Sequence, residues 1–439
     1  MIAVSRAARL ERSKWVLTIV KLIGASLTIG WGLASTYVFA RVLVEIELAN
    51  FIVLIALANF TIGAELGISN ILYDRLRRAH IGVDNDFAFA ELAALLAVLC
   101  TAVALATGGV GVAIALGVIS TGLPALFVAL FALAAVNMIV LLAKRSLAAI
   151  DRNLGFEAID IARRLINLAL MLAVLSGFDA TLSIFAQLLV SLLAIGLCFG
   201  LNSRALGASI KDWTKIAPGL RILKMRYSTK LGPAMALTIA DIAAYNLPFI
   251  VIASLGDYLR PLLLYDFLYK LLRVLGTATR AVTEAQLPRL TRAVHTGDAR
   301  GLRIGLWETF GTGFGFAVVL AVLLLAAGPA AAALLYDGKL SLSARDAIAM
   351  ALPLLVLPAA ALSVHLNSSL ARFRELVVAN IPLLVAAALA PVISMLAFAD
   401  GDWGWGSLVL FASAYLVTAA LHVRLLGRAA RATTQISSS

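Results

Sequence analysis

The chain has 439 residues, of which 62% are hydrophobic and 14% charged, and its formal net charge at pH 7 is +12. Soluble proteins are about 45–50% apolar and about 25% charged, so this composition excludes a soluble enzyme, a disordered chain and a secreted disulfide scaffold. The surplus apolar side chains must face lipid. The surplus of Lys and Arg then belongs to cytoplasmic loops, and not to a nucleic-acid interface.

Twelve stretches are apolar and long enough to cross a membrane as helices, which takes about 20 residues each. In chain order they are 15–34, 48–68, 87–108, 120–143, 159–175, 182–201, 231–255, 261–282, 306–327, 347–366, 376–397 and 406–426. The region 87–143 contains one charged residue, Glu91, and could hold two or three helices. The stretch 159–175 opens with three charged residues that we place at the membrane interface: Asp160, Arg163 and Arg164.

The distribution of the 36 Lys and Arg residues predicts the orientation. If the N-terminus is cytoplasmic, most of them fall in cytoplasmic stretches, and four fall in outer loops: Arg41, Arg260, Lys339 and Arg345. Basic loops flank the region 87–143 on both sides, so an even number of helices lies between them. We therefore predict two helices there and both termini in the cytoplasm.

The longest basic loop, 202–230, separates six predicted spans from six others. Residues 27–29 and 237–239, both Leu-Thr-Ile, lie in the first span of each half. The sequence thus predicts an all-α integral membrane protein with two six-helix lobes, 1–215 and 216–439. Because each half has an even number of spans, the lobes should be related by a pseudo-two-fold axis along the membrane normal.

Motifs for catalysis are missing from the sequence. It contains no GxxxxGK[ST] phosphate loop, and its two cysteines lie in apolar runs. The histidines have no metal-ligand spacing; they are His80, His295, His365 and His422. We therefore expect neither an enzyme, nor a metal site, nor a cofactor.

The eighth predicted span carries polar residues at steps of four, three, four and three: Asp266, Lys270, Arg273, Thr277 and Arg280. At this spacing they share an arc of about 80° on a helix. Each charge costs roughly 2.5–3.5 kcal/mol at the bilayer centre, so the stripe must face protein or water. Either it lines a cavity, or Asp266–Lys270 and Arg280–Glu284 pair within a packed bundle.

Two further spans carry single charges at membrane depth. Asp241 in the seventh span, four residues before Tyr245, is either an ion- or proton-coupling site or the partner of a neighbouring cation. Lys21 in the first span either lines a cavity or snorkels to the cytoplasmic surface. Together these positions predict a cationic cavity between two lobes, suited to phosphate or pyrophosphate on an amphipathic substrate.

Several segments resemble polysaccharide flippases of the multidrug/oligosaccharidyl-lipid/polysaccharide (MOP) exporter superfamily. They are GDYLRPLLLYDFLYKLL at 256–272, LPRLTR at 287–292, ELGISN at 65–70, and the connection 145–167. The resemblance covers nearly the whole chain in span number and loop length. It implies two six-helix lobes around a cavity that opens alternately to either side of a bacterial inner membrane.

The resemblance also implies a substrate, an oligosaccharide linked to undecaprenyl pyrophosphate, and partners, a polysaccharide polymerase and glycosyltransferases. Basic cavity residues of the early and the seventh to eighth helices serve such proteins; Lys21, Lys270 and Arg273 fall at such positions here, and we add Arg280 as a candidate. We name Asp241 and Asp266 as candidates for coupling or pairing. The alternative is a cation-coupled multidrug or metabolite antiporter, which predicts an aromatic cavity rich in carboxylates.

Overall fold

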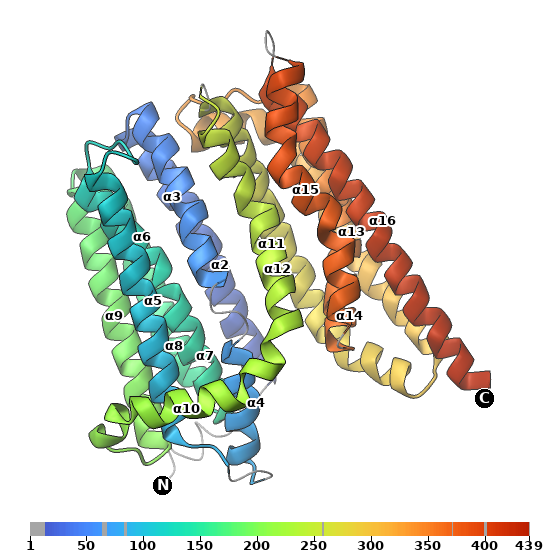
Figure 1. Ribbon diagram of the computed structural model, residues 1–439. Helices are drawn as coiled ribbons and strands as arrows, with labels where there is room; N and C mark the ends of the chain where they lie inside the picture. Colours follow the sequence, from blue (N-terminus) through green and yellow to red (C-terminus); the bar gives the residue numbers. More distant parts are fainter. Residues whose placement is uncertain are drawn as a thin grey trace. The chain divides into compact units, whose positions relative to one another are not determined.

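The computed structural model describes residues 14–63, 68–82, 86–256, 259–370, 372–398 and 402–438. In this part of the chain the regular structure is helical, with no strand (Figure 1). The long helices are α2 (Lys14–Val42), α3 (Glu45–Gly63), α5 (Phe89–Ala115), α6 (Pro124–Ala135), α7 (Asn137–Ala149), α8 (Asn153–Ala173), α9 (Ala180–Ala205), α11 (Ser228–Ala253), α12 (Leu259–His295), α13 (Ala299–Leu335), α14 (Ala344–Ser369), α15 (Phe373–Ala397) and α16 (Trp403–Ser438). The short ones are α4 (Ile68–His80), α10 (Ile216–Arg226) and the 3₁₀ turns η1 (Val174–Ser176) and η2 (Ile210–Thr214).

The prediction of an all-α membrane protein is confirmed. Each of the twelve predicted spans overlaps a long helix, with α6 and α7 together forming one span. Among the described residues, nine spans are long and apolar enough to cross a membrane. The remaining three long helices carry charges: α8 and α12 along their length, and α3 at Glu45 and Glu47 in its first turn.

The region 87–143 forms two spans, as the charge distribution predicts. The first is α5, and the second is the pair α6–α7, which is interrupted at Val136. At this break the Asn137 side-chain amide donates to the backbone carbonyls of Leu133 and Ala134, at 3.4 and 3.1 Å. Such side-chain bonds compete with the helical ladder, which accounts for the interruption within one apolar stretch.

The chain forms two compact units. Unit 1 contains residues 1–39 and 57–238, and unit 2 contains residues 40–56 and 239–439. Helices α2, α3 and α11 therefore each contribute residues to both units. The lobes 1–215 and 216–439 are a division by chain order, and they stay a prediction. Residues 65–67 and 257–258, which belong to two of the segments with the family resemblance, lie outside the described residues.

In unit 1, α5 packs against α6, α7 and α10, and α9 packs against α6, α7 and α8. The short helix α10 lies so close to α5 that a Cβ at Gly219 would stand 2.0 Å from the carbonyl oxygen of Ala90, a position that only glycine can occupy. Glu91 is fully buried and accepts hydrogen bonds from Arg75 at 2.8 Å and from Tyr227 at 3.1 Å. Glu91 is thus a buried anchor within unit 1.

In unit 2, α12 packs against α13, α14 and α16, and α16 packs against α14 and α15. A buried hydrogen-bond network joins three of these helices: the ring nitrogens of His422 lie 3.1 Å from the Ser363 hydroxyl and 3.1 Å from the Asn380 side-chain oxygen.

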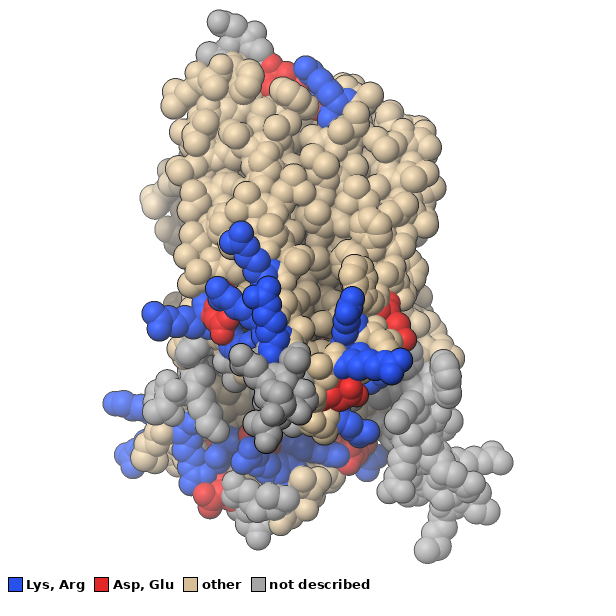
Figure 2. All heavy atoms as spheres, turned by 90° about the vertical axis from the view of Figure 1, so that its right-hand side faces the viewer, with Lys and Arg blue, Asp and Glu red and all other residues tan. Residues whose placement is uncertain are grey.

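Figure 2 shows one face on which Lys and Arg gather over the lower part, below a broad region with almost no charged residue. This is the charge pattern expected of a membrane-spanning protein with a basic cytoplasmic side.

Candidate functional site

The first part of the α12 stripe is an ion pair buried in unit 2. The Lys270 ammonium group donates to the Asp266 carboxylate, and the side chains of the two residues are only 15% and 12% exposed. Tyr336, at the end of α13, donates from its hydroxyl to the same carboxylate at 2.7 Å, and the Lys270 Nζ lies 5.8 Å from its ring centre. This part of the stripe follows the pairing alternative.

The second part of the stripe has a different environment. Arg273 and Arg280 are exposed, as is Glu284. Among the described residues none of the three takes part in an ion pair, so the expected Arg280–Glu284 pair is not formed. An exposed guanidinium at membrane depth is costly in lipid, which predicts water or a ligand beside these arginines.

Asp241 on α11 is exposed, and tyrosines surround its position. The hydroxyls of Tyr245 and Tyr415 are 2.7 Å apart, and the ring centres of Tyr245 and Tyr269 are 6.0 Å apart. The Asp241 carboxylate interacts electrostatically with Arg280, although the two form no ion pair among the described residues. One carboxylate and a group of tyrosines thus lie near the exposed arginines of α12.

Lys21 on α2 is exposed, and within the described residues it forms no ion pair. One turn further along, a Cβ at Gly24 would lie 3.4 Å from Oε2 of Glu157, so this carboxylate lies against α2. Lys144 on α7 points its Nζ at the other oxygen of Glu157, at 3.9 Å, and it repels Lys21 electrostatically. Lys144 therefore lies near both Glu157 and Lys21 in unit 1, and sequence reasoning found only Lys21.

A second charged cluster in unit 1 lies on α8 and is largely buried. Asp160 accepts hydrogen bonds from Arg163 at 2.7 Å and from Arg164 at 2.6 Å. Arg163 and Asn167 both donate to the hydroxyl of Ser191 on α9, at 3.4 and 3.3 Å. The side chains of Asp160 and Arg163 are only 5% and 6% exposed, so these two charges pair inside unit 1; their position at the membrane interface stays a prediction.

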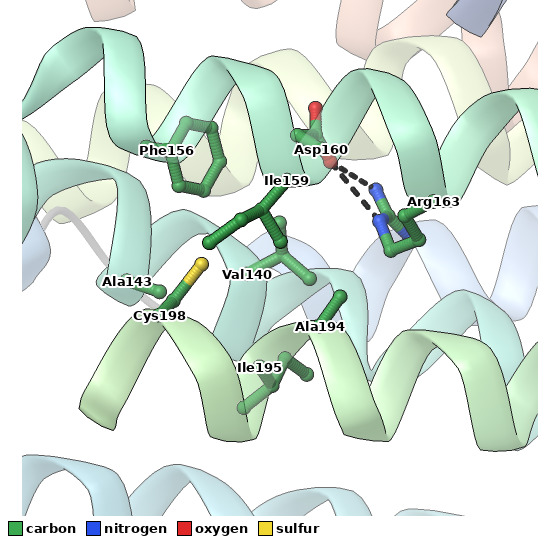
Figure 3. Close-up of a pocket in the computed structure, with 9 residues that line it drawn as sticks. All are labelled: Val140, Ala143, Phe156, Ile159, Asp160, Arg163, Ala194, Ile195 and Cys198. Atoms are coloured by element: carbon green, nitrogen blue, oxygen red, sulfur yellow. Dashed lines mark hydrogen bonds and ion pairs between the residues drawn. The ribbon is translucent and has the colours of Figure 1, made fainter. Parts of the chain in front are cut away.

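Figure 3 shows a small recess beside this cluster, between α7, α8 and α9, in which the Asp160 and Arg163 side chains point toward one another. They are the only charged residues among the nine that line it: Val140, Ala143, Phe156, Ile159, Asp160, Arg163, Ala194, Ile195 and Cys198. Because the two charges neutralise each other and the remaining walls are apolar, we assign the recess a role in packing.

The spacing of the α8 residues contains a signal that could have revealed this cluster. Glu157, Asp160, Arg164 and Asn167 follow one another at steps of three, four and three, which is the spacing of the α12 stripe. The interruption of the apolar run led us to place these charges at a helix end. Among the described residues, no group of three or more His, Cys, Asp or Glu side chains could hold a metal ion.

Comparison with known proteins gives a fold but no close relative. No family model matches the chain, and no curated protein matches it. Among solved structures, a mutant of the Vibrio cholerae MATE transporter VcmN matches over 98% of both chains, with 14% identity and a TM-score of 0.66.

A multidrug resistance MATE family transporter of the MOP superfamily matches in an inward-facing structure (12% identity, 96% of both chains, TM-score 0.58) and in an outward-facing structure (14%, 98% of both chains, 0.60). A MOP superfamily transporter from Pyrococcus furiosus, whose structure is described as having a binding pocket of reverse polarity, matches with 14% identity over 97% of this chain and 98% of that one, at a TM-score of 0.55. The chain therefore has the fold of MATE transporters, with about twelve helices in two lobes.

Proposed function

We propose that the chain is a transporter that works by alternating access. The support is its fold, which it shares along nearly its full length with MATE family transporters captured in an inward-facing and in an outward-facing conformation. The two compact units are consistent with rigid-body motion of one bundle against the other. We propose the bacterial inner membrane as its location, with both termini in the cytoplasm.

The substrate that we propose is an anionic amphipath, an oligosaccharide linked to undecaprenyl pyrophosphate, which the protein flips to the outer leaflet. The observation that carries this proposal is the separation of charges on α12: Asp266 is occupied by Lys270 and Tyr336, whereas Arg273 and Arg280 are exposed and unpaired among the described residues. Guanidinium groups bind phosphate oxygens with strong, charge-assisted hydrogen bonds.

Lys21 and Lys144 support the same substrate from unit 1, because the two ammonium groups are close enough to repel each other and, among the described residues, the nearby carboxylate of Glu157 pairs with Lys144 alone, at 3.9 Å. A MOP transporter with a pocket of reverse polarity also exists among the structural neighbours. Its reverse polarity is described as suggesting a different function, which supports the idea that this fold can serve substrates of different charge. A polysaccharide polymerase and glycosyltransferases are the partners that we propose for such a flippase.

One observation favours a second function, a cation-coupled multidrug or metabolite antiporter. Asp241 is exposed beside Tyr245, whose hydroxyl lies 2.7 Å from that of Tyr415. A carboxylate near aromatic rings can bind an organic cation or exchange a proton. Since Arg280 lies within electrostatic range of Asp241, the local charge is balanced, and we place this function second.

Purified protein in proteoliposomes distinguishes the two functions. With a short lipid-pyrophosphate oligosaccharide as substrate, we expect Arg273→Ala or Arg280→Ala to reduce flipping by at least about tenfold, because one lost charged hydrogen bond is worth about 1.5–3 kcal/mol. The matched control is Arg289→Ala: Arg289 lies on the same helix but is ion-paired with Glu308 at 2.8 Å. Ion-dependent efflux of an organic cation that Asp241→Asn abolishes, without lipid flipping, would establish the second function instead.

A further inference from the structure

The four basic residues predicted in outer loops all have partners in unit 2. Arg260 pairs with Asp346 and Asp402, and Arg345 pairs with Asp402. The other two, Arg41 and Lys339, join segments that are almost 300 residues apart in the sequence. These last two residues connect the turn between α2 and α3 with the turn between α13 and α14.

Arg41 and Lys339 make reciprocal contacts. The Arg41 guanidinium donates to the backbone carbonyl of Leu334 at 2.9 Å and lies 3.6 Å from the Asp337 carboxylate. In return, the Lys339 ammonium donates to the carbonyl of Ala40, and to that of Leu43 at 3.0 Å. We call these four contacts, between residues 40–43 and 334–339, the outer clasp.

The clasp is built on two helix ends. The last four carbonyls of a helix lack intrahelical partners and lie at the negative end of its dipole, so a cation there is stabilising. Leu334 lies in the last turn of α13 and Ala40 in the last turn of α2. Each helix therefore receives its C-terminal cation from the other. Asp337 and Gly338, with φ of 55° and 75°, turn the chain after α13 so that Lys339 reaches α2.

The position of the clasp in the chain is unusual. Residues 40–56 belong to unit 2, whereas the residues on either side of them belong to unit 1. Helices α2 and α3 thus cross the border between the units, and the clasp holds their shared turn in unit 2. Any motion of one unit against the other must either bend α2 and α3 or release this turn. Its ion pair is exposed to water, since Asp337 is 51% exposed, and exposed ion pairs are weak.

Tyr336 connects the clasp with the buried pair on α12. This residue immediately precedes Asp337, its side chain is fully buried, and its hydroxyl donates to Asp266 at 2.7 Å. Asp266 in turn forms an ion pair with Lys270. A change in the charge state or position of the Asp266–Lys270 pair therefore acts directly on the residue next to the clasp.

We infer that the outer clasp is a latch that closes the outer ends of α2 and α13 and that opens during the transport cycle. This inference rests on the proposed transport function, because that function gives the latch its purpose. The opening itself can be measured without any substrate, so a failed flipping assay and a failed latch are separate results.

The test uses the full chain in nanodiscs, with Cys100→Ala and Cys198→Ala to remove the native thiols. Thr36, on α2 five residues before Arg41, is 1% exposed and becomes the reporter as Thr36→Cys. We expect the combined variant Arg41→Ala/Lys339→Ala to react at least about tenfold faster with a polar maleimide, which corresponds to the loss of about 1.4 kcal/mol from the closed state.

Arg345→Ala is the matched control. Arg345 is another predicted outer cation, its side chain is 56% exposed, and it pairs with Asp402 outside the clasp. This control should keep the slow reaction. Equal rates in the clasp variant and in Arg345→Ala, in proteins that melt at the parent temperature, would overturn the latch.

If the alanine variants fail to fold, a cross-linking experiment tests whether the clasp opens. In Arg41→Cys/Asp337→Cys, a short bifunctional maleimide should join the two turns and stop transport of whichever substrate the parent carries. The same variant without the cross-linker should still transport. Full transport by the cross-linked protein would show that the clasp stays closed throughout the cycle, and it would refute the inference.

Discussion

Helices α8 and α12 carry the same spacing of polar residues but in different environments. On α8 the stripe is Glu157, Asp160, Arg164 and Asn167, and on α12 it is Asp266, Lys270, Arg273, Thr277 and Arg280. The α8 stripe lies largely buried within unit 1, where its carboxylates face cations of α7 and α8. The α12 stripe is paired only in its first turns and is exposed further along.

The comparison shows what helical periodicity can and cannot establish. A polar stripe at steps of three and four must avoid lipid, and both helices obey this rule. Whether the stripe meets protein or water depends on partners from other helices, such as Ser191 for α8 and Tyr336 for α12. Charged residues on a membrane helix therefore become candidates for binding only where such partners are missing.

Removal of Asp160 should have the largest effect. Asp160→Ala leaves the buried Arg163 without its carboxylate, and breaking a buried ion pair costs about 3–5 kcal/mol. We expect this loss in the free energy of unfolding, measured by SDS or thermal unfolding of the solubilised protein. Because replacing both partners with apolar residues is often neutral, Asp160→Leu/Arg163→Met should recover much of the loss. A single variant as stable as the parent would contradict the assignment of α8 as a structural helix.

The buried pair on α12 should matter less. Lys270→Met removes one charged hydrogen bond, worth about 1.5–3 kcal/mol, but the Tyr336 hydroxyl still donates to Asp266. We expect a smaller loss of stability than for Asp160→Ala in the same unfolding assay. Adding Tyr336→Phe should then cost more in the Lys270→Met background than in the parent. Strictly additive effects would show that the three side chains do not act as one cluster.

The sequence predicted the number of spans and the α12 stripe, but it could not predict which residues of the stripe are paired and which are exposed. Local spacing showed that Asp266 and Lys270 could pair, and the structure confirms that pair. The third member, Tyr336, is 70 residues away along the chain, so no local pattern marks it. For the same reason no local pattern connects Lys144, which directly follows the predicted span 120–143, with Glu157 on the next helix. The partner on a second helix is a property of packing, which periodicity does not contain.

Substitution of Arg273 should have a large effect on substrate binding and a small effect on stability, unlike substitution of Asp160 or Lys270. Its side chain is exposed and forms no ion pair among the described residues, and surface substitutions usually change stability by less than about 0.5 kcal/mol. We expect Arg273→Ala to unfold like the parent while it loses affinity for a lipid pyrophosphate, measured by titration in detergent. A marked loss of stability would place this arginine with the α8 residues, as part of the packed structure.

The smallest effect should come from an ion pair at the protein surface, between Asp212 and Lys215, whose side chains are 26% and 58% exposed. Asp212, in η2, accepts hydrogen bonds from Lys215 at 2.8 Å and from the backbone and hydroxyl of Ser209. These bonds, led by that of Lys215, lower the pKa of Asp212 from 3.8 to about 2. Since the folded pKa is depressed, the stabilisation is complete above pH 3.8 and is lost as the pH falls through about 2.

At neutral pH, Asp212→Asn should lower the melting temperature only slightly, because solvent screens most of the interaction between Asp212 and Lys215. The carbon resonance of the Asp212 carboxyl, assigned by comparison with the Asn variant, should titrate with a midpoint near 2. A midpoint near the ordinary value would show that the Lys215 and Ser209 contacts do not persist in solution. The contacts of Asp160 would then persist in solution while those of Asp212 do not. The different burial of the two aspartates would no longer be enough to explain why Asp160 stabilises the fold and Asp212 does not.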